Sequence, residues 1–371
     1  MATPTESALA KQDWAVVRSL LPDGWIEQAR VSGAMRRARG IDGPETLLRI
    51  LLLHLAAGYS LSETATRARA AGLGRLSAVA LFKRVQAAEE WLRWLAAAER
   101  DLLVLDSPAS PRRLRAVDAT TVSEPGSTGT DWRVHYSISL TDLQCDHFEL
   151  TDVKGGETWR RIPVAPGDVL LGDRAYGTPP GIAHVVAAQG DVLVRMSPHR
   201  LPLFDVGGKR IDVLKAARRL RVGQVLDLPT WVRSPAGQLI AGRLVALKRT
   251  AAATERARRK LERTAQRKGR KSSPESWEAA RYLLLWTTLR PSVKAKDVTE
   301  YYRWRWQIEL GFKRMKSILG LGHLPKKDPA SARAWLHGKL LTSLLVERLI
   351  QAARVISPWG YKLQEPPKPL A

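Results

Sequence analysis

LRAVDATTV, at residues 114–122, opens the part of the chain that decides the fold. WRVHYSISL at 132–140 and DHFELTDV at 146–153 follow it, and all three segments are short and rich in Val, Ile, Thr, Tyr and Phe. Gly, Ser and Asp separate them, which is typical of successive β-strands. The sequence therefore predicts that a sheet begins at Leu114.

Strands and helices then alternate along the chain. VLLGDRAYG at 169–177 predicts a buried strand that ends in a turn, PGIAHVVAAQG at 180–190 a helix, and DVLVRMS at 191–197 a further strand. QVLDLPTWVRS at 224–234, LIAGRLVALKR at 239–249 and RYLLLWTTL at 281–289 add strand-like runs. The pattern indicates an α/β fold with a β-rich insertion before a last helical part.

Residues 12–103 are predicted to be helical, because Ala and Leu are abundant and apolar residues recur every three to four positions. Ser60 followed by Glu63 has capping-box spacing, and Ser77 can cap the next helix after a break at residues 72–74. This arrangement favours a helix-turn-helix unit whose basic residues contact DNA. Those residues are Arg36, Arg37, Arg39, Lys83 and Arg84. A helical bundle with a solvated basic face explains the same pattern.

The charge balance points to a polyanionic partner. The chain of 371 residues has 60 Lys and Arg against 36 Asp and Glu, a formal net charge of +24. Nucleic acid is the first candidate, because neutralising phosphates releases condensed counterions. Two units or more are expected in a chain of this length.

Membrane association, export and zinc-finger binding are not expected. The most apolar run, residues 47–57, contains Arg49 and His54 and is shorter than the roughly 20 residues that a membrane span requires. The first residues lack the pattern of a secretory signal, which predicts a cytoplasmic, nucleoid-associated protein. Cys145 is the single cysteine, so it has no disulfide partner in the chain and no zinc-ligand spacing with the histidines.

YYRWRWQIELGFKRMK, at residues 301–316, is the most informative segment for function. At about 100° per residue, four polar side chains fall within one helical stripe of roughly 60°. They are Tyr302, Arg305, Glu309 and Lys316. An apolar stripe borders them, formed by Trp304, Ile308, Phe312, Met315 and Leu319. Such a helix can hold a carboxylate over the end of a sheet, although a solvated Arg305–Glu309 pair is the plainer interpretation.

Two aspartates in strand-like runs complete a possible catalytic trio. Asp118 lies inside RAVDATTV, where a carboxylate is costly to bury without a partner, and Asp173 follows LLG at a strand end. Each alone has a structural explanation, at a sheet edge or in a turn. Together with Glu309, they predict hard oxygen ligands for Mg²⁺ or Mn²⁺. A pair of such ions can activate a water or a DNA 3′-hydroxyl and neutralise the leaving oxygen of a phosphodiester. The expected phosphate-binding neighbours are Tyr302, Arg305 and Lys316.

At these residues the chain resembles DDE transposases of the insertion-sequence-4 family, whose signature is the spacing Tyr302, Arg305, Glu309 and Lys316. VDATTV is similar to the strand with the first aspartate, GDRAYG to the motif with the second, and VLVRMS to the strand after it. ELTDVKGGET and GHLPKKDPASARAWLHGKLL are similar too, so the resemblance covers roughly residues 60–350. Ala119 and Ala175 depart from the family, because glycine is frequent at both positions.

The resemblance implies a domain organisation and a reaction. It implies a ribonuclease-H-like catalytic core at residues 106–200 and 291–350, with a β-rich insertion at 201–290, a helical DNA-binding region at 1–105 and a tail at 351–371. It further implies cut-and-paste transposition: metal-dependent cleavage at insertion-sequence ends and strand transfer to target DNA. Asp118, Asp173 and Glu309 would then be catalytic ligands of two Mg²⁺ or Mn²⁺ ions. Double-stranded DNA is the expected partner, bound by a homodimer on paired ends.

Several further DNA contacts are expected on the same basis. Relatives with this insertion hold a flipped base with an aromatic side chain; Trp286 is the candidate here, Tyr282 on the same strand face is the alternative, and a core position explains either ring. Arg195, after a strand, is a candidate phosphate contact or an ordinary surface arginine. A basic run is expected to bind the DNA backbone without reading sequence, unless it is a solvated linker. It comprises Arg256, Arg258, Arg259, Lys260, Arg267, Lys268, Arg270 and Lys271.

Two other functions stay open at this point. One is a metal-dependent nuclease on the same fold that cuts DNA without joining it. The other is a non-catalytic DNA-binding protein, which would bind DNA independently of metal and cut no substrate.

Overall fold

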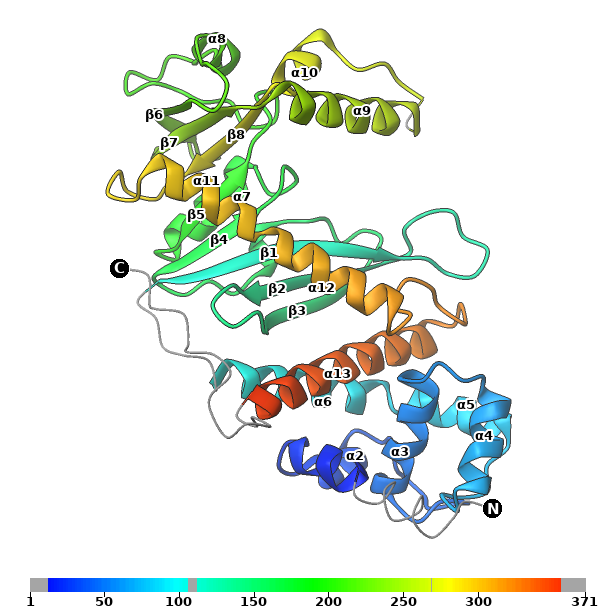
Figure 1. Ribbon diagram of the computed structural model, residues 1–371. Coiled ribbons are helices and arrows are strands. Elements are labelled where there is room, and N and C mark those ends of the chain that lie inside the picture. Colours follow the sequence, from blue (N-terminus) through cyan, green and yellow to red (C-terminus); the bar gives the residue numbers. More distant parts are fainter. Residues whose placement is uncertain (1–12, 106–111, 268, 355–371) are drawn as a thin grey trace, which may run out of the picture.

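The computed structural model describes residues 13–105, 112–267 and 269–354 (Figure 1). Helices labelled before the sheet are α2 (Trp25–Val31), α3 (Pro44–Leu55), α4 (Leu61–Ala70), α5 (Ala78–Ala87) and α6 (Glu89–Leu105). The predicted caps are confirmed, because the Ser60 and Ser77 hydroxyls each accept a backbone N–H, from Glu63 and from Ala80, at 3.1 Å. Helices α4 and α5 therefore begin where the sequence indicated.

In the described residues, one eight-stranded sheet runs through the molecule in the order β3-β2-β1-β4-β5-β8-β7-β6. Its first five strands are β1 (Arg113–Val122), β2 (Trp132–Ser139), β3 (Cys145–Asp152), β4 (Asp168–Gly172) and β5 (Asp191–Arg195). Strands β1, β2 and β3 form an antiparallel meander, whereas β4 is parallel to both β1 and β5. The mixed α/β class and each of these predicted strands are confirmed.

The later strands extend this same sheet. They are β6 (Val225–Arg233), β7 (Leu239–Lys248) and β8 (Tyr282–Thr287). Strand β8 lies antiparallel between β5 and β7, so the chain forms β6 and β7 at the far edge of the sheet before it returns beside β5. Helices α8 (Val213–Arg218), α9 (Ala251–Arg267) and α10 (Pro274–Ala279) lie at this end of the molecule (Figure 1). The β-rich segment expected as a separate insertion is thus continuous with the sheet of the core.

Two consecutive helices, α11 (Ala295–Trp304) and α12 (Trp306–Ser317), cross one face of the sheet (Figure 1). The apolar side of α12 packs in one core with Ala116 of β1, through Ile308, Phe312 and Met315. Val117 points to the opposite face, which α7 (Pro179–Ala187) covers. Because alternate strand residues face opposite sides, Asp118 lies on the α12 side. Trp304 and Leu319, expected on the same apolar stripe, are only partly covered.

The segment predicted as one helix is divided at Arg305. Helix α11 ends at Trp304 and α12 starts at Trp306, while Arg305 keeps helical dihedrals (φ −51°, ψ −25°). The Ile308 N–H bonds the Arg305 carbonyl at 3.3 Å, so the two helices continue one another across this junction.

The C-terminal helix α13 (Pro329–Arg354) packs beside α6 at the lower end of the view (Figure 1). None of the described helices is long and apolar enough to cross a lipid bilayer. Lys268 and the Pro-rich tail expected from residue 357 lie outside the described residues.

Candidate active site

Asp118 is a largely buried carboxylate on β1, with 20% of its side chain exposed. Its Oδ1 accepts the backbone N–H of Ala119 at 2.8 Å, and its Oδ2 lies 3.4 Å from Arg305 Nη1. Burial, and to a smaller extent the charges of Asp173 and Glu157, raise the pKa of Asp118 to about 7, against the opposing effects of the Ala119 amide and Arg305. The ionised form of this side chain is therefore disfavoured, and a cation bound nearby would stabilise it.

Asp173 immediately follows β4, the parallel neighbour of β1, at the level of Asp118. Ala116 pairs with Leu171, and each aspartate follows its strand's paired residue by two positions. The Asp173 Oδ1 accepts the backbone N–H of Ala175 at 2.7 Å. Ala119 and Ala175 thus supply the amides that fix the two carboxylates.

Gly172 allows the strand end before Asp173 to pack closely. A Cβ added at Gly172 would lie 2.6 Å from a ring atom of Trp159 and 2.9 Å from the Tyr176 Cβ, closer than real Cβ contacts. Glycine here lets the Trp159 ring lie against the backbone, and the Trp159 and Tyr176 rings pack at 4.6 Å between centroids. The Trp159 and Tyr176 rings therefore pack against the backbone just before Asp173 and fix the loop that carries it.

Arg305 joins the glutamate of α12 to the first aspartate. Its Nη2 lies 2.5 Å from Glu309 Oε1, while its Nη1 contacts Asp118 Oδ2. The Arg305 side chain is only 12% exposed, whereas that of Glu309 is 36% exposed, so the pair is partly buried on the arginine side. Among the described residues, no three His, Cys, Asp or Glu side chains lie close enough together to form a metal site. A guanidinium group separates the two acids instead.

Tyr302 lies beside this group, whereas Lys316 lies at the other end of α12. The Arg305 guanidinium is 5.6 Å from the centroid of the Tyr302 ring. Burial raises the pKa of Tyr302, and the positive charges of Arg305 and Arg195 oppose that shift. Lys316 is exposed, runs alongside Gly322 and forms no ion pair in the described part of the chain. The structure brings Tyr302 to the acids, and the role of Lys316 stays a prediction.

Two further residues of the site were not singled out from the sequence. Burial raises the pKa of Glu157, and the charge of Asp173 raises it further. Its partner is Arg133, whose Nε lies 3.7 Å from Glu157 Oε1. The Tyr176 hydroxyl is buried without a hydrogen-bond partner among the described residues, and its pKa is raised by burial and then by Asp118, Glu157 and Asp173. Both residues lie in quoted motifs, KGGET and GDRAYG, that could have indicated them.

Trp286 and Tyr282, the candidates for holding a flipped base, are part of the core. Trp286 is 0% exposed and donates its indole N–H to the Thr230 hydroxyl at 3.2 Å, and Tyr282 is 2% exposed. Both rings share one core with Leu284, as expected from strand alternation. In this conformation neither ring is accessible to a DNA base.

The basic residues of the helical region differ in their availability. Arg84 donates from Nη2 to the carbonyls of Arg37 and Arg39, at 2.7 and 3.4 Å, and therefore anchors the loop before α3. Lys83 and the side chains of Arg36, Arg37 and Arg39 are exposed. Exposed cations are thus present in this region, whereas Arg84 is engaged in hydrogen bonds that hold the loop.

The basic run lies mostly on α9, of which only Ala265 is buried. Arg259 pairs with Glu255 at 3.0 Å, and Arg258 lies over the Trp277 ring at 5.0 Å. The exposed members of the run that are described include Arg256, Lys260, Arg267, Arg270 and Lys271. This run is a helix with an exposed basic surface, so it is not an extended linker between residues 251 and 267.

Residues 109–345, more than half of the chain, match the family described as Transposase DDE domain. The chain belongs to the DDE transposase family. It is 32% identical to the transposase InsL of insertion sequence element IS186A from Escherichia coli K12, over 93% of this chain and 96% of the relative. The transposase of insertion sequence element IS421 from Escherichia coli has the same identity and the same coverage of both chains. The expectation of a DNA transposase is confirmed.

The catalytic domain of human endonuclease V is a solved structure with limited similarity. It shares 14% sequence identity, and the match covers 61% of this chain and 97% of that domain. The TM-score is 0.27, which is too low to support an argument about the fold.

Proposed function

We propose that this transposase cuts the ends of an insertion sequence in a metal-dependent reaction and joins the freed 3′ ends to target DNA. The observation that carries the proposal is the contact of Arg305 with both Asp118 and Glu309. One guanidinium there bridges acids from β1 and α12, and Asp173 is close enough to raise the pKa of Asp118. The relatives are transposases of insertion sequence elements, which supports the same substrate class for this chain.

The finer classification is part of this proposal. Membership of the insertion-sequence-4 family is supported by the spacing of Tyr302, Arg305, Glu309 and Lys316. The strand order β3-β2-β1-β4-β5, with β4 and β5 parallel to β1, supports a ribonuclease-H-like core over residues 106–200 and 291–350. Residues 201–290 would be the insertion and residues 1–105 the DNA-binding region.

The donor set fits a hard divalent cation such as Mg²⁺ or Mn²⁺. Carboxylate oxygens are the ligands that these ions prefer, and Asp118, Asp173 and Glu309 offer them. Burial and mutual repulsion raise the pKa of Asp118, and a bound cation would relieve both effects. When bound, a pair of ions would supply the charge that activates the attacking hydroxyl and stabilises the leaving oxygen.

The residues of the chain prepare this reaction in separate ways. The amides of Ala119 and Ala175 orient Asp118 and Asp173 before any ligand arrives. Arg305 pairs with Asp118 and Glu309 in the absence of metal, and on binding DNA its guanidinium would turn to a phosphate oxygen. The junction at residue 305, between α11 and α12, is where a small rotation would bring Glu309 closer to the aspartates.

The remaining contacts with DNA are proposed from the charge distribution. The exposed cations of α9 and of the loop before α3 would bind backbone phosphates without reading sequence. A net charge of +24 supports double-stranded DNA as the partner and association with the nucleoid. We propose a homodimer on paired ends, because each end must be cut and then joined.

The test uses isosteric replacements of the three acids. Asp118→Asn, Asp173→Asn and Glu309→Gln should each abolish Mg²⁺-dependent cutting of the DNA that flanks the gene, while binding of that DNA persists. Glu300→Gln is the matched control, because Glu300 is an exposed acid of α11 paired with Arg303. Cutting at the wild-type rate by any of the three acid variants would refute the site.

A strand-transfer assay with pre-cut ends separates the proposal from a nuclease. A transposase joins the 3′ ends to a target plasmid, whereas a nuclease yields hydrolysed product alone. DNA binding that does not depend on metal, with no cutting of any substrate, would indicate a non-catalytic DNA-binding protein.

A further inference from the structure

Three arginines gather where β4, β5 and β7 end. Arg195 is the last residue of β5, and Arg174 follows Asp173 just beyond β4. Arg249 follows β7, and its backbone N–H bonds the Arg281 carbonyl beside β8 at 2.9 Å. Strand β8 is antiparallel to both β5 and β7, so β4, β5 and β7 run in one direction and end at one edge of the sheet. This is the edge that carries Asp173.

The three side chains are half-buried and lack acidic partners. In the described part of the chain none of them forms an ion pair, and the Arg174 Nε is buried with no hydrogen-bond partner. Arg249 Nη1 donates to the Ala280 carbonyl at 3.1 Å. Burial and then the positive charge of Arg195 lower the pKa of Arg249 to about 10. The charges of Arg195 and Arg249 act on Arg174, and Tyr302 and Asp173 offset them only in part, so the cluster concentrates positive charge.

Other buried arginines of this protein are paired. Arg115, which is 2% exposed, bonds Asp146 and Asp168, at 2.7 and 2.9 Å. Arg243, which is 4% exposed, bonds Asp227 at 2.5 Å. Because a buried unpaired charge is costly, the cluster at the end of the sheet is expected to receive its anion from outside the chain.

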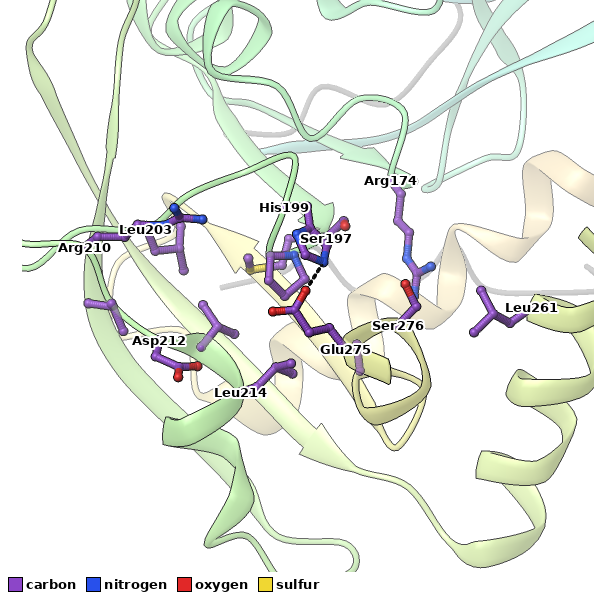
Figure 2. Close-up of a pocket in the computed structure, with 15 residues that line it drawn as sticks. Arg174, Ser197, His199, Leu203, Arg210, Asp212, Leu214, Leu261, Glu275 and Ser276 are labelled. Atoms are coloured by element: carbon purple, nitrogen blue, oxygen red, sulfur yellow. Dashed lines mark ion pairs between the residues drawn. The ribbon is translucent and has the colours of Figure 1, made fainter. Parts of the chain in front are cut away.

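Space for a ligand exists beside the cluster. A cavity of about 390 Å³ lies between the β5–α8 segment, α9 and α10, and the Arg174 side chain points into it toward Ser276 (Figure 2). The acids on its wall are already engaged: Glu275 pairs with His199 at 2.8 Å, and Asp212 accepts the Lys215 N–H at 2.9 Å. An anion approaching Arg174 therefore meets an N–H group with no hydrogen-bond partner among the described residues. The acids Glu275 and Asp212 on the cavity wall already have partners.

We propose that Arg174, Arg195 and Arg249 bind one backbone phosphate of the element-end DNA, next to the phosphate that is cut. The guanidinium fork matches phosphate oxygens and stays charged at neutral pH. Arg174 is covalently adjacent to Asp173, so a phosphate held by the cluster belongs to a nucleotide near the reacting one. This inference rests on the proposed function, and it assigns Arg174 and Arg249 a role in positioning the strand.

The test measures binding of an element-end duplex by fluorescence anisotropy without divalent metal, which separates binding from cutting. Arg174→Gln, Arg195→Gln and Arg249→Gln should each weaken binding by about ten-fold, the value of a charge-assisted hydrogen bond. The slope of log Kd against log salt concentration should decrease by about one, the value expected for the loss of one phosphate contact. Arg290→Gln is the matched control, because Arg290 is exposed and lies beyond the opposite end of β8.

Neutral methylphosphonate linkages, placed one at a time, identify the phosphate. At one position near the cut, the neutral linkage should weaken wild-type binding about ten-fold and should cost the Arg195→Gln protein nothing further. Arg249→Lys, which keeps the charge, should retain most of the affinity and serves as the second variant if a glutamine variant does not fold.

Four outcomes would overturn the inference. The first three are wild-type affinity and salt slope in the glutamine variants, an equal loss of affinity for Arg290→Gln, and, at every methylphosphonate position, a loss that adds to the loss of the arginine variant. A loss seen only with duplexes that carry a 5′-terminal phosphate would also overturn it, in favour of a site for the cut end. Wild-type cutting by the Asp118, Asp173 or Glu309 variants would refute the proposed active site and leave these binding results unaffected.

Discussion

Replacing Asp118 with asparagine should make the metal-free protein more stable at alkaline pH, although it removes an ionisable group of the active site. Burial raises the pKa of Asp118 from 3.8 to about 7 in the folded protein. Each pKa unit corresponds to about 1.4 kcal/mol, so the ionised carboxylate lowers the free energy of unfolding by up to about 4 kcal/mol. The contact with Arg305 is already included in that pKa.

The sign of the pH dependence follows from proton binding. Between pH 3.8 and about 7 the folded protein holds a proton on Asp118 that the unfolded chain has released. The contribution of this group to stability therefore falls as the pH rises through that window. Asparagine cannot ionise, so the variant and the wild type should be equally stable near the acid end and should differ most above the folded pKa.

The assay is urea-induced unfolding with a metal chelator present, at about pH 4 and about pH 8. Asp131→Asn is the control of opposite sign, because the Glu124 amide bonds the Asp131 carboxylate and lowers its pKa. That variant should lose stability at the higher pH. An Asp118→Asn protein that is less stable than the wild type at about pH 8, or a difference that does not vary with pH, would refute the reasoning.

Three other predictions concern stability, each measured by urea unfolding. Arg115→Met leaves Asp146 and Asp168 buried with fewer partners and should cost about 3 to 5 kcal/mol; a neutral effect would show that the carboxylates become protonated or rehydrated. Trp286→Ala should cost a similar amount, because its indole is fully buried, and Trp286→Phe less; a small loss for alanine would mean that the ring is not part of the core. Ser60→Ala should cost about 1 kcal/mol through the lost cap of α4, and Ser60→Asp should restore it.

The strands were predictable because their chemistry is local. Apolar and β-branched runs between turn residues located the meander, β4 and β5 to within about two residues. Local hydroxyl caps likewise located the starts of α4 and α5. These features depend on residues that are neighbours in the sequence.

The way distant segments combine was not predictable from local patterns. Strand β8 has the composition of any buried strand, and nothing in it indicates that it pairs with β5 on one side and β7 on the other. The helical stripe predicted that Arg305 and Glu309 share a face, but not that the same guanidinium reaches Asp118. Glu157 was missed because a lone acid in a loop has no periodic pattern to distinguish it.

The return of the chain at β8 limits where this transposase can be altered. Residues 196–281 connect β5 to β8, its neighbour in the sheet, and include β6 and β7 at the sheet's far edge, so both ends of this segment are fixed next to Asp173 and Arg195. A length change close to either end would shift the register of the catalytic edge. The turn at residues 234–238, where Gly237 adopts φ +83°, is the distal tip of the β6–β7 hairpin. A tag or an extra domain grafted at that tip would leave the reactive end of the sheet in place.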